Sequence, residues 1–325
     1  MQFARSSLLA LAALTLGASE QAAIAQSYPS NVIRIVIGAP AGVPTDIVGR
    51  IVANELAQSE GWRIVVENKP GAMSSVSAPE VLKQPADGHT ILATGLPSVV
   101  GPALLSNASF RLDTDFAPVI KLMTANHVLV VNPSVPAKSL AELVALLKSQ
   151  PDKHTFSSGG FGTPAHLAGE LFKLQTGVRV AHVPYRSLPQ AIADLINGTN
   201  HYQFITPLPV LDLVAAGKLR ALAVTAPKRM PALEDVPTVV EVGFPDLVIQ
   251  DFVGWVVKSG TPDDVIAQLN KATNRVLAKP SVREAFANIA AEPAGGPAAE
   301  FGAFLKAQIV HWGNVVAEAG IKIRE

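Results

Sequence analysis

The chain contains no cysteine, and this absence removes several kinds of chemistry. A protein without thiols forms no disulfide, has no thiolate nucleophile and offers no cysteine ligand to a metal. Its histidines also lack the H-x-x-x-H and H-x-H spacings that metal sites favour. We therefore expect no metal site and no cofactor.

The sequence also lacks an excess of charge of either sign. It has 26 Lys and Arg residues against 26 Asp and Glu residues, a formal net charge of +0, and no cluster of basic residues. These features argue against nucleic acid or an anionic membrane as the main partner. Only 16% of the residues are charged and 49% are hydrophobic, which argues against disorder. A length of 325 residues favours two domains.

No apolar run is long enough to span a bilayer, including the one near the N-terminus. That run, at 8–16, follows Arg5 and precedes an A-x-A sequence at 23–25. The pattern predicts a secretory signal peptide over residues 1–25, cleaved after Ala25. A buried N-terminal helix is the alternative. Because no cysteine follows the cleavage site, we expect an exported protein without a lipid anchor.

The same short module occurs twice, at residues 33–70 and 154–186. In each copy a strand runs into small residues, a Pro/Thr pair opens a helix, and a second strand follows. A small-residue loop at a helix start exposes backbone N–H groups, and the helix dipole favours negative charge there. Two such loops on two lobes can hold one small anion between them.

Apolar runs and helical patterns alternate along most of the chain. Strands are expected at 32–37, 63–66, 90–93, 128–131, 178–183, 202–205, 219–225 and 253–257. Helices are expected at 46–57, 139–148, 164–174, 189–196, 262–277 and 298–318. This alternation predicts an α/β protein with mainly parallel sheets, in which ligands bind at the carboxyl ends of the strands.

The lobe boundaries are not marked by a flexible linker. The repeat favours a chain that leaves lobe 1 at 123–126, builds lobe 2, and returns at 244–251. We expect lobe 1 to comprise residues 26–124 plus 248–325, and lobe 2 to comprise residues 125–247. The two crossings would then form a two-stranded hinge.

The first loop, residues 38–46, is a candidate anion site. Its small side chains let a ligand approach the backbone closely. Its candidate ligand-binding residues are Ala41, Gly42, Val43, Thr45 and Asp46. An ordinary strand-to-helix turn capped by Thr45 or Asp46 explains the same residues, and that alternative stays open.

The second loop, residues 157–164, has three glycines within four positions, more than a turn needs. Its candidate ligand-binding residues are Ser158, Gly160, Phe161, Gly162 and Thr163, whose hydroxyls can donate to an anion. It matches neither the G-x-x-x-x-G-K-[ST] phosphate motif nor the G-x-G-x-x-G dinucleotide motif.

His166, on the first turn of the following helix, is a further candidate ligand contact. Paired with Ser157 or Ser158 it could instead serve an α/β hydrolase, although the chain has no G-x-S-x-G nucleophile elbow. Tyr185 ends the strand that follows this helix, at an edge where ligands bind. It is expected to line the cleft.

Many stretches of the chain resemble one family. They include YPSNVIRIVI, VVENKPGA, PADGHTILA, VVNPSVPAKSLAELVAL, SGGFGTPAHLAGELF, HVPYR, AAGKLRALAVT, PALEDVPTVVEVGF and SGTPDDVIAQLN. In these the mature chain resembles the Bug-type solute-binding proteins, the receptors of tripartite tricarboxylate transporters. The resemblance implies a periplasmic, monomeric Venus-flytrap protein without catalytic activity. It also implies a small carboxylate as the ligand and membrane transporter subunits as partners, which for an orphan receptor are encoded elsewhere or absent.

The chain departs from the family pattern at the expected ligand contacts. Val43 stands where the family usually has a second glycine, and Pro44 removes one N–H donor from the first loop. Phe161 replaces a small polar residue, and Ile205 stands where an acidic residue is common. These residues make the cleft more apolar. We therefore expect a carboxylate with an aromatic or apolar body rather than aspartate or citrate.

Overall fold

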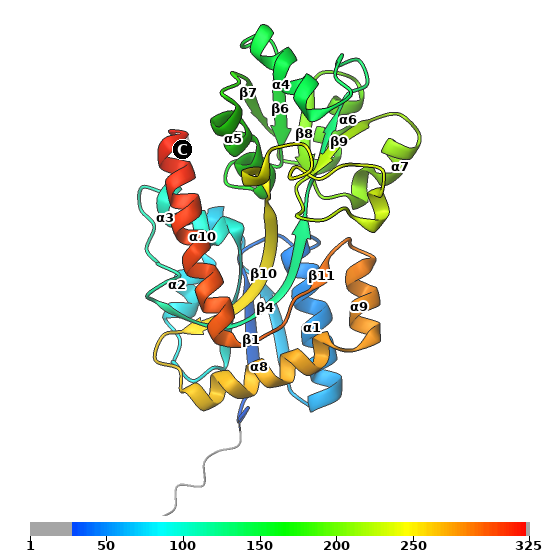
Figure 1. Cartoon of the computed structure of the whole chain (residues 1–325). Coiled ribbons are helices and arrows are strands. Elements are labelled where there is room, and N and C mark those ends of the chain that lie inside the picture. The colour runs from blue at the N-terminus through cyan, green and yellow to red at the C-terminus, as the bar shows by residue number, and fades with distance from the viewer. Residues whose placement is uncertain (1–27, 323–325) are drawn as a thin grey trace, which may run out of the picture.

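The computed structural model describes residues 28–322, so the signal peptide predicted for residues 1–25 lies outside the described residues. Two β-sheets form two lobes, one above the other in Figure 1, and helices cover both sheets. We call the part built on the larger sheet lobe 1 and the part built on the smaller sheet lobe 2. Among the described residues, no helix has the length and apolar character needed to cross a membrane.

The sheet of lobe 1 has the strand order β11-β4-β10-β3-β1-β2. Its strands are β1 (Ile33–Ile37), β2 (Ile64–Asn68), β3 (Thr90–Gly95), β4 (Phe116–Asn126), β10 (Gln250–Lys258) and β11 (Glu292–Pro293). The sheet of lobe 2 has the order β7-β6-β8-β5-β9. Its strands are β5 (Val128–Val131), β6 (Thr155–Ser158), β7 (Ala181–Pro184), β8 (Tyr202–Ile205) and β9 (Arg220–Val224).

The helices are placed between these strands in the chain. They are α1 (Pro44–Glu60), α2 (Ser77–Leu82), α3 (Leu96–Leu104), α4 (Leu140–Ser149), α5 (Pro164–Thr176), α6 (Leu188–Ile196), α7 (Leu211–Ala215), α8 (Asp263–Leu277), α9 (Pro280–Ala287) and α10 (Ala298–Glu318). Short 3-10 turns are η1 (Ala72–Ser74), η2 (Leu208–Val210), η3 (Pro231–Leu233) and η4 (Pro245–Leu247).

Both sheets are mixed, which corrects the expectation of mainly parallel sheets. β1 pairs in parallel with β2 and β3, and β6 pairs in parallel with β7 and β8. The strands at the crossings, β4 and β10 in lobe 1 and β5 in lobe 2, pair antiparallel with their neighbours. Because the chain leaves lobe 1 on one strand and returns on another, the two crossing strands run in opposite directions. The alternation of strands and helices in the sequence does not show the direction of a strand.

Apolar side chains fill both faces of the lobe 1 sheet. Ile33, Ile35 and Ile37 point into a cluster with α1, α8 and α9, whereas Val36 and Leu92 join a cluster with α2, α3 and α10. The second cluster continues into lobe 2 through Phe156 and Leu167. α10 contacts both α3 and α5, so this helix runs along the side of both lobes (Figure 1).

Local sequence signals explain where several of these helices begin. Ser139 caps α4, accepting a hydrogen bond from the Glu142 backbone N–H at 3.1 Å. Proline occupies the first turn of α1, α3, α5 and α6, where its missing N–H costs nothing. The predicted strands at 128–131 and 202–205 and the helix at 298–318 have the bounds that were expected.

Candidate functional site

Three parallel strands of lobe 1 end at one edge of their sheet. β1 lies between β2 and β3, and all three run in the same direction. The first loop and α1 follow β1, the η1 turn follows β2, and α3 follows β3. Because carboxyl ends of parallel strands share one edge, these three segments lie side by side.

The three segments enclose a cavity of about 50 Å³. Its lining residues, none of them charged, are Gly38, Ala39, Thr45, Met73, Ser74, Ala93, Gly95, Pro97 and Ser98. The hydroxyl oxygens of Ser74 and Ser98 lie 2.7 Å apart, and both residues are buried. The first turns of α1 and α3 begin at this cavity, so their backbone N–H groups add the positive ends of two helix dipoles.

The backbone of the η1 turn is strained. Met73 has φ of 51° and Ser74 has φ of 66°, a left-handed region that residues with a side chain rarely adopt. Each such residue costs on the order of 1–3 kcal/mol, and such strain concentrates at ligand sites. A Cβ built on Gly101 of α3 would lie 2.8 Å from the Met73 carbonyl oxygen, so the turn packs closely onto α3.

Asp46 holds the first loop in shape. Its carboxylate accepts hydrogen bonds at 2.9 Å from the Gly42 backbone N–H, the Arg50 guanidinium and the Asn68 amide. Burial opposes ionisation of Asp46, but these three donors outweigh it and lower the pKa of the carboxyl. The oxygens of Asp46 thus point into the loop, and direct contact of Asp46 with a ligand stays a prediction.

The second loop is held by neutral groups. The Thr163 hydroxyl caps α5 by accepting from the His166 N–H at 3.4 Å, and it donates to the Gly160 carbonyl at 2.7 Å. The Gly162 N–H donates to His166 Nδ1 at 3.2 Å. The Gly160 N–H donates to the Ser158 hydroxyl at 3.1 Å. These bonds leave the loop without any charged partner.

A pair of histidine rings packs against the second loop. His166 and His182 have ring centroids 4.3 Å apart, and Phe161 meets each ring edge-on at 5.3 Å. Burial, with Lys173 adding to it, lowers the pKa of His166 to about 4. Burial, followed by His166 and Lys173, lowers the pKa of His182 to about 3. Both rings are therefore neutral near pH 7, as a close pair requires.

Met73 of the η1 turn lies against the second loop. A Cβ built on Gly162 would lie 2.7 Å from the sulfur of Met73 and 3.1 Å from its Cγ. Gly162 also has φ of 72°. Only glycine combines this backbone with this close approach. The side chain of Met73 therefore lies between the cavity of lobe 1 and the second loop.

The remaining predicted residues take different positions. Phe161 is 39% exposed on the second loop, and Val43 stands at the N-cap of α1 without a side-chain hydrogen bond. The Tyr185 hydroxyl donates to Asp194 and is therefore engaged inside lobe 2. Ile205 is buried among apolar residues of lobe 2. Contact of any of these residues with a ligand stays a prediction.

Met73, Ser74 and Ser98 were missed by the analysis of sequence. In both repeated modules a strand is followed by glycine and then by a proline that opens a helix. Gly95-Leu96-Pro97 gives the same signal, which points to the neighbouring Ser98. Nothing comparable marks Met73 and Ser74, because residues with side chains give no sign of a left-handed turn.

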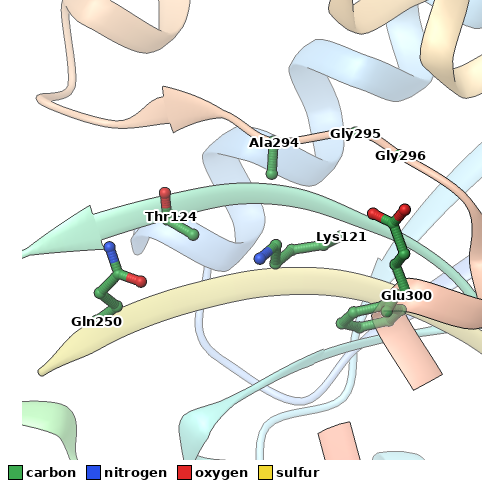
Figure 2. A pocket seen from close by; sticks show the side chains of 8 residues that line it. Lys121, Thr124, Gln250, Ala294, Gly295, Gly296 and Glu300 are labelled. Atoms are coloured by element: carbon green, nitrogen blue, oxygen red, sulfur yellow. The ribbon is translucent and has the colours of Figure 1, made fainter. Parts of the chain in front are cut away.

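A second cavity, of about 500 Å³, lies on the flank of lobe 1 (Figure 2). Lys121 and Thr124 of β4, Gln250 of β10 and Glu300 of α10 line it together with the turn at 294–296. Burial lowers the pKa of Lys121, although Glu300 opposes this. The cavity shares no lining residue with the first cavity or with either loop, so size alone does not identify the candidate site.

The alternative of a hydrolase using His166 with Ser157 or Ser158 is wrong. Ser158 pairs with His182 at 2.7 Å rather than with His166, and Ser157 donates to Gln203 at 3.2 Å. Both serines are fully buried. A nucleophile must reach its substrate, whereas these hydroxyls form hydrogen bonds in the interior of lobe 2.

Comparison with known proteins identifies the family of this chain. The model of the tripartite tricarboxylate transporter family receptor, TctC, matches residues 48–321. Protein BugT of Bordetella pertussis is 32% identical over 302 residues, 92% of this chain and 93% of BugT.

Two solved structures share the fold. Rpa4515 of R. palustris with adipate has 30% identity and a TM-score of 0.78, covering 91% of this chain and 99% of that one. MatC (Rpa3494) from Rhodopseudomonas palustris with bound malate has 27% identity and a TM-score of 0.76, covering 89% of this chain and all of that one (100%). These matches confirm the predicted fold of a two-lobed α/β periplasmic binding protein. The chain belongs to the TctC family, the non-enzymatic solute-binding receptors of tripartite tricarboxylate transporters.

Proposed function

We propose that this chain is a periplasmic receptor that binds a small carboxylate between the first and second loops and delivers it to membrane subunits of a tripartite tricarboxylate transporter. In this proposal residues 26–124 and 248–325 move as one lobe and residues 125–247 as the other. The signal peptide is cleaved after Ala25, and the mature protein is a monomer.

One observation carries the proposal. Uncharged hydroxyl and backbone groups from three strand ends converge on a cavity of about 50 Å³, and the second loop faces it through Met73. A carboxylate there would accept hydrogen bonds from Thr45, Ser74 and Ser98 and from the first turns of α1 and α3. Adipate and malate in the two related structures are ligands of the same chemical class.

The body of the ligand is proposed to be aromatic or apolar. Phe161 is exposed on the second loop, Met73 lines the cavity, and no charged residue lines it. A ligand with several buried charges would need several partners, because an unpaired buried charge is costly. A single carboxylate on an apolar body places its charge among the hydroxyls and its hydrocarbon against Met73 and Phe161.

Thermal unfolding of the mature chain with benzoate, hexanoate, malate or citrate tests this proposal. A ligand at about 100 times its Kd adds about 2.7 kcal/mol to the free energy of unfolding, which raises the midpoint by a few degrees. We expect shifts with benzoate or hexanoate. A shift with citrate alone would contradict the apolar body, and no shift with any acid would contradict the carboxylate function.

Ser98→Ala and Ser59→Ala form a matched pair for the position of the site. Ser98 lines the cavity, whereas Ser59 is exposed on α1 and its hydroxyl donates to Glu55. Loss of one hydrogen bond of about 0.5–1.5 kcal/mol should weaken binding by about twofold to tenfold in Ser98→Ala. Ser59→Ala should bind as the wild type does. Equal affinities in the two variants would remove the cavity from the site.

A further inference from the structure

We infer that Met73 sets specificity by separating the cavity of lobe 1 from the second loop, so that the closed protein selects an acid with one carboxylate over the same body with two. This inference rests on the proposed function, because it concerns the ligand of the same site.

Met73 has contacts in both lobes. It lines the cavity with Ser74 and Ser98, and its sulfur reaches the position that a Cβ of Gly162 would occupy, 2.7 Å away. The hydroxyl groups of the cavity and the backbone of the second loop thus belong to different lobes. The thioether lies between them.

The position of Met73 is fixed by its surroundings. The residue is only 7% exposed and belongs to the cluster that spans both lobes. Its backbone is left-handed, and its carbonyl oxygen and Cβ lie 2.8 and 3.1 Å from a Cβ built on Gly101. The turn cannot move toward α3, and the side chain is directed across the cleft. Such a constrained residue selects ligands by what it excludes.

The chemistry of the side chain decides which ligand fits. A thioether is a weak acceptor and has no donor, so it cannot stabilise a carboxylate. It is polarizable and packs well against hydrocarbon and aromatic rings. An acid with one carboxylate in the cavity presents its body to Met73, whereas a second carboxylate pointing to Gly162 would meet Met73 without a partner.

Two pairs of acids with matched bodies test the inference: hexanoate with adipate, and benzoate with terephthalate. Titration calorimetry of the mature wild type should give at least tenfold tighter binding of the member with one carboxylate. In Met73→Gly, which suits the left-handed backbone and removes the thioether, this ratio should fall at least tenfold. Met73→Leu, of similar volume, should keep the ratio, and thermal unfolding checks that both variants fold.

Each other outcome contradicts the inference in a recognisable way. An unchanged ratio in Met73→Gly, or a wild type that binds the diacids as tightly as the monoacids, overturns the role of Met73 while the carboxylate function stands. A wild type that binds none of the four acids overturns the inference together with the proposed function. Should Met73→Gly unfold, Met73→Asn gives the same test, because asparagine tolerates the left-handed region.

Discussion

The first and second loops follow the same plan of strand, small residues and helix, yet different side chains hold them. In the first loop, the carboxylate of Asp46 gathers donors from Gly42, Arg50 and Asn68, and no side chain caps α1. In the second loop, Thr163 caps α5 and the neutral His166 supports the backbone. The first loop depends on an ionised carboxylate, whereas the hydrogen bonds of the second loop come from neutral groups. The repeat therefore fixes the path of the chain but not what stabilises it.

The largest effect is expected where the second loop meets Met73. Gly162→Val places a branched side chain at φ of 72° and 2.7 Å from the sulfur of Met73. We expect the lobes to stay apart and binding of benzoate or hexanoate to be lost, while the far-ultraviolet circular dichroism stays that of a folded protein. Titration calorimetry measures the loss.

Gly177→Val is the matched control for Gly162→Val. Gly177 stands at the other end of the same helix with φ of 69°, and a Cβ there would meet nothing within 4 Å. It therefore carries the same backbone strain without the contact, and it should lower stability but keep binding. Normal binding in Gly162→Val would mean that the close approach of Gly162 to Met73 is not needed for binding.

Asp46→Asn tests the dependence of the first loop on charge. The substitution keeps the size of the side chain but leaves Arg50 without its anion and the Gly42 N–H with a weaker acceptor. We expect a loss of about 1–3 kcal/mol in the free energy of unfolding, measured by urea denaturation. Asp152→Asn, which breaks the exposed pair with Arg179, should change stability by less than about 1 kcal/mol. Equal losses would show that Asp46 contributes no more than a surface ion pair.

The two neutral histidine rings beside the second loop predict a dependence of stability on pH. His166 and His182 have folded pKa values of about 4 and about 3, below the ordinary value of 6.5. The unfolded chain therefore binds protons first as the pH falls from about 6.5 toward 4, and stability is lost across that window. Each histidine contributes at most about 1.4 kcal/mol per pH unit.

His182→Gln isolates this contribution. It keeps a hydrogen-bonding group near Ser158 but removes one buried imidazole. The unfolding midpoint of the variant should fall less steeply than that of the wild type between pH 6.5 and 4, and the two slopes should agree between pH 7 and 8. Parallel curves over the whole range would remove His182 from the pH dependence.

Sequence patterns reached one half of the site more easily than the other. The second loop could be predicted from its three glycines and from the Pro/Thr pair before α5, because each of these residue types favours the local backbone conformation that it adopts. The two-lobed α/β fold could be predicted from the family resemblance and from the alternation of strands and helices. The η1 turn escaped because Met73 and Ser74 adopt a backbone that their residue types disfavour, and tertiary packing onto Gly101 holds it. Ser98 lies on the first turn of α3, and only the pairing of the preceding strand, β3, with β1 brings it to the site.

Thr163→Ala is expected to have the smallest effect of the four. The hydroxyl of Thr163 caps α5 and also donates to the Gly160 carbonyl, so its loss should cost about 1 kcal/mol of stability, within the range of about 0.5–2 kcal/mol for cap removal. Ser187→Ala is the control, because Ser187 holds the same N-cap position on α6 but makes no capping hydrogen bond. Its stability should stay within about 0.5 kcal/mol of the wild type. Urea denaturation compares the two variants.

If Thr163→Ala also weakens binding beyond what its stability explains, the hydroxyl contacts the ligand as well as the helix. If the two variants lose the same stability, the cap of the second loop is no stronger than the uncapped N-terminus of α6, and the contrast between the loops rests on their charges alone.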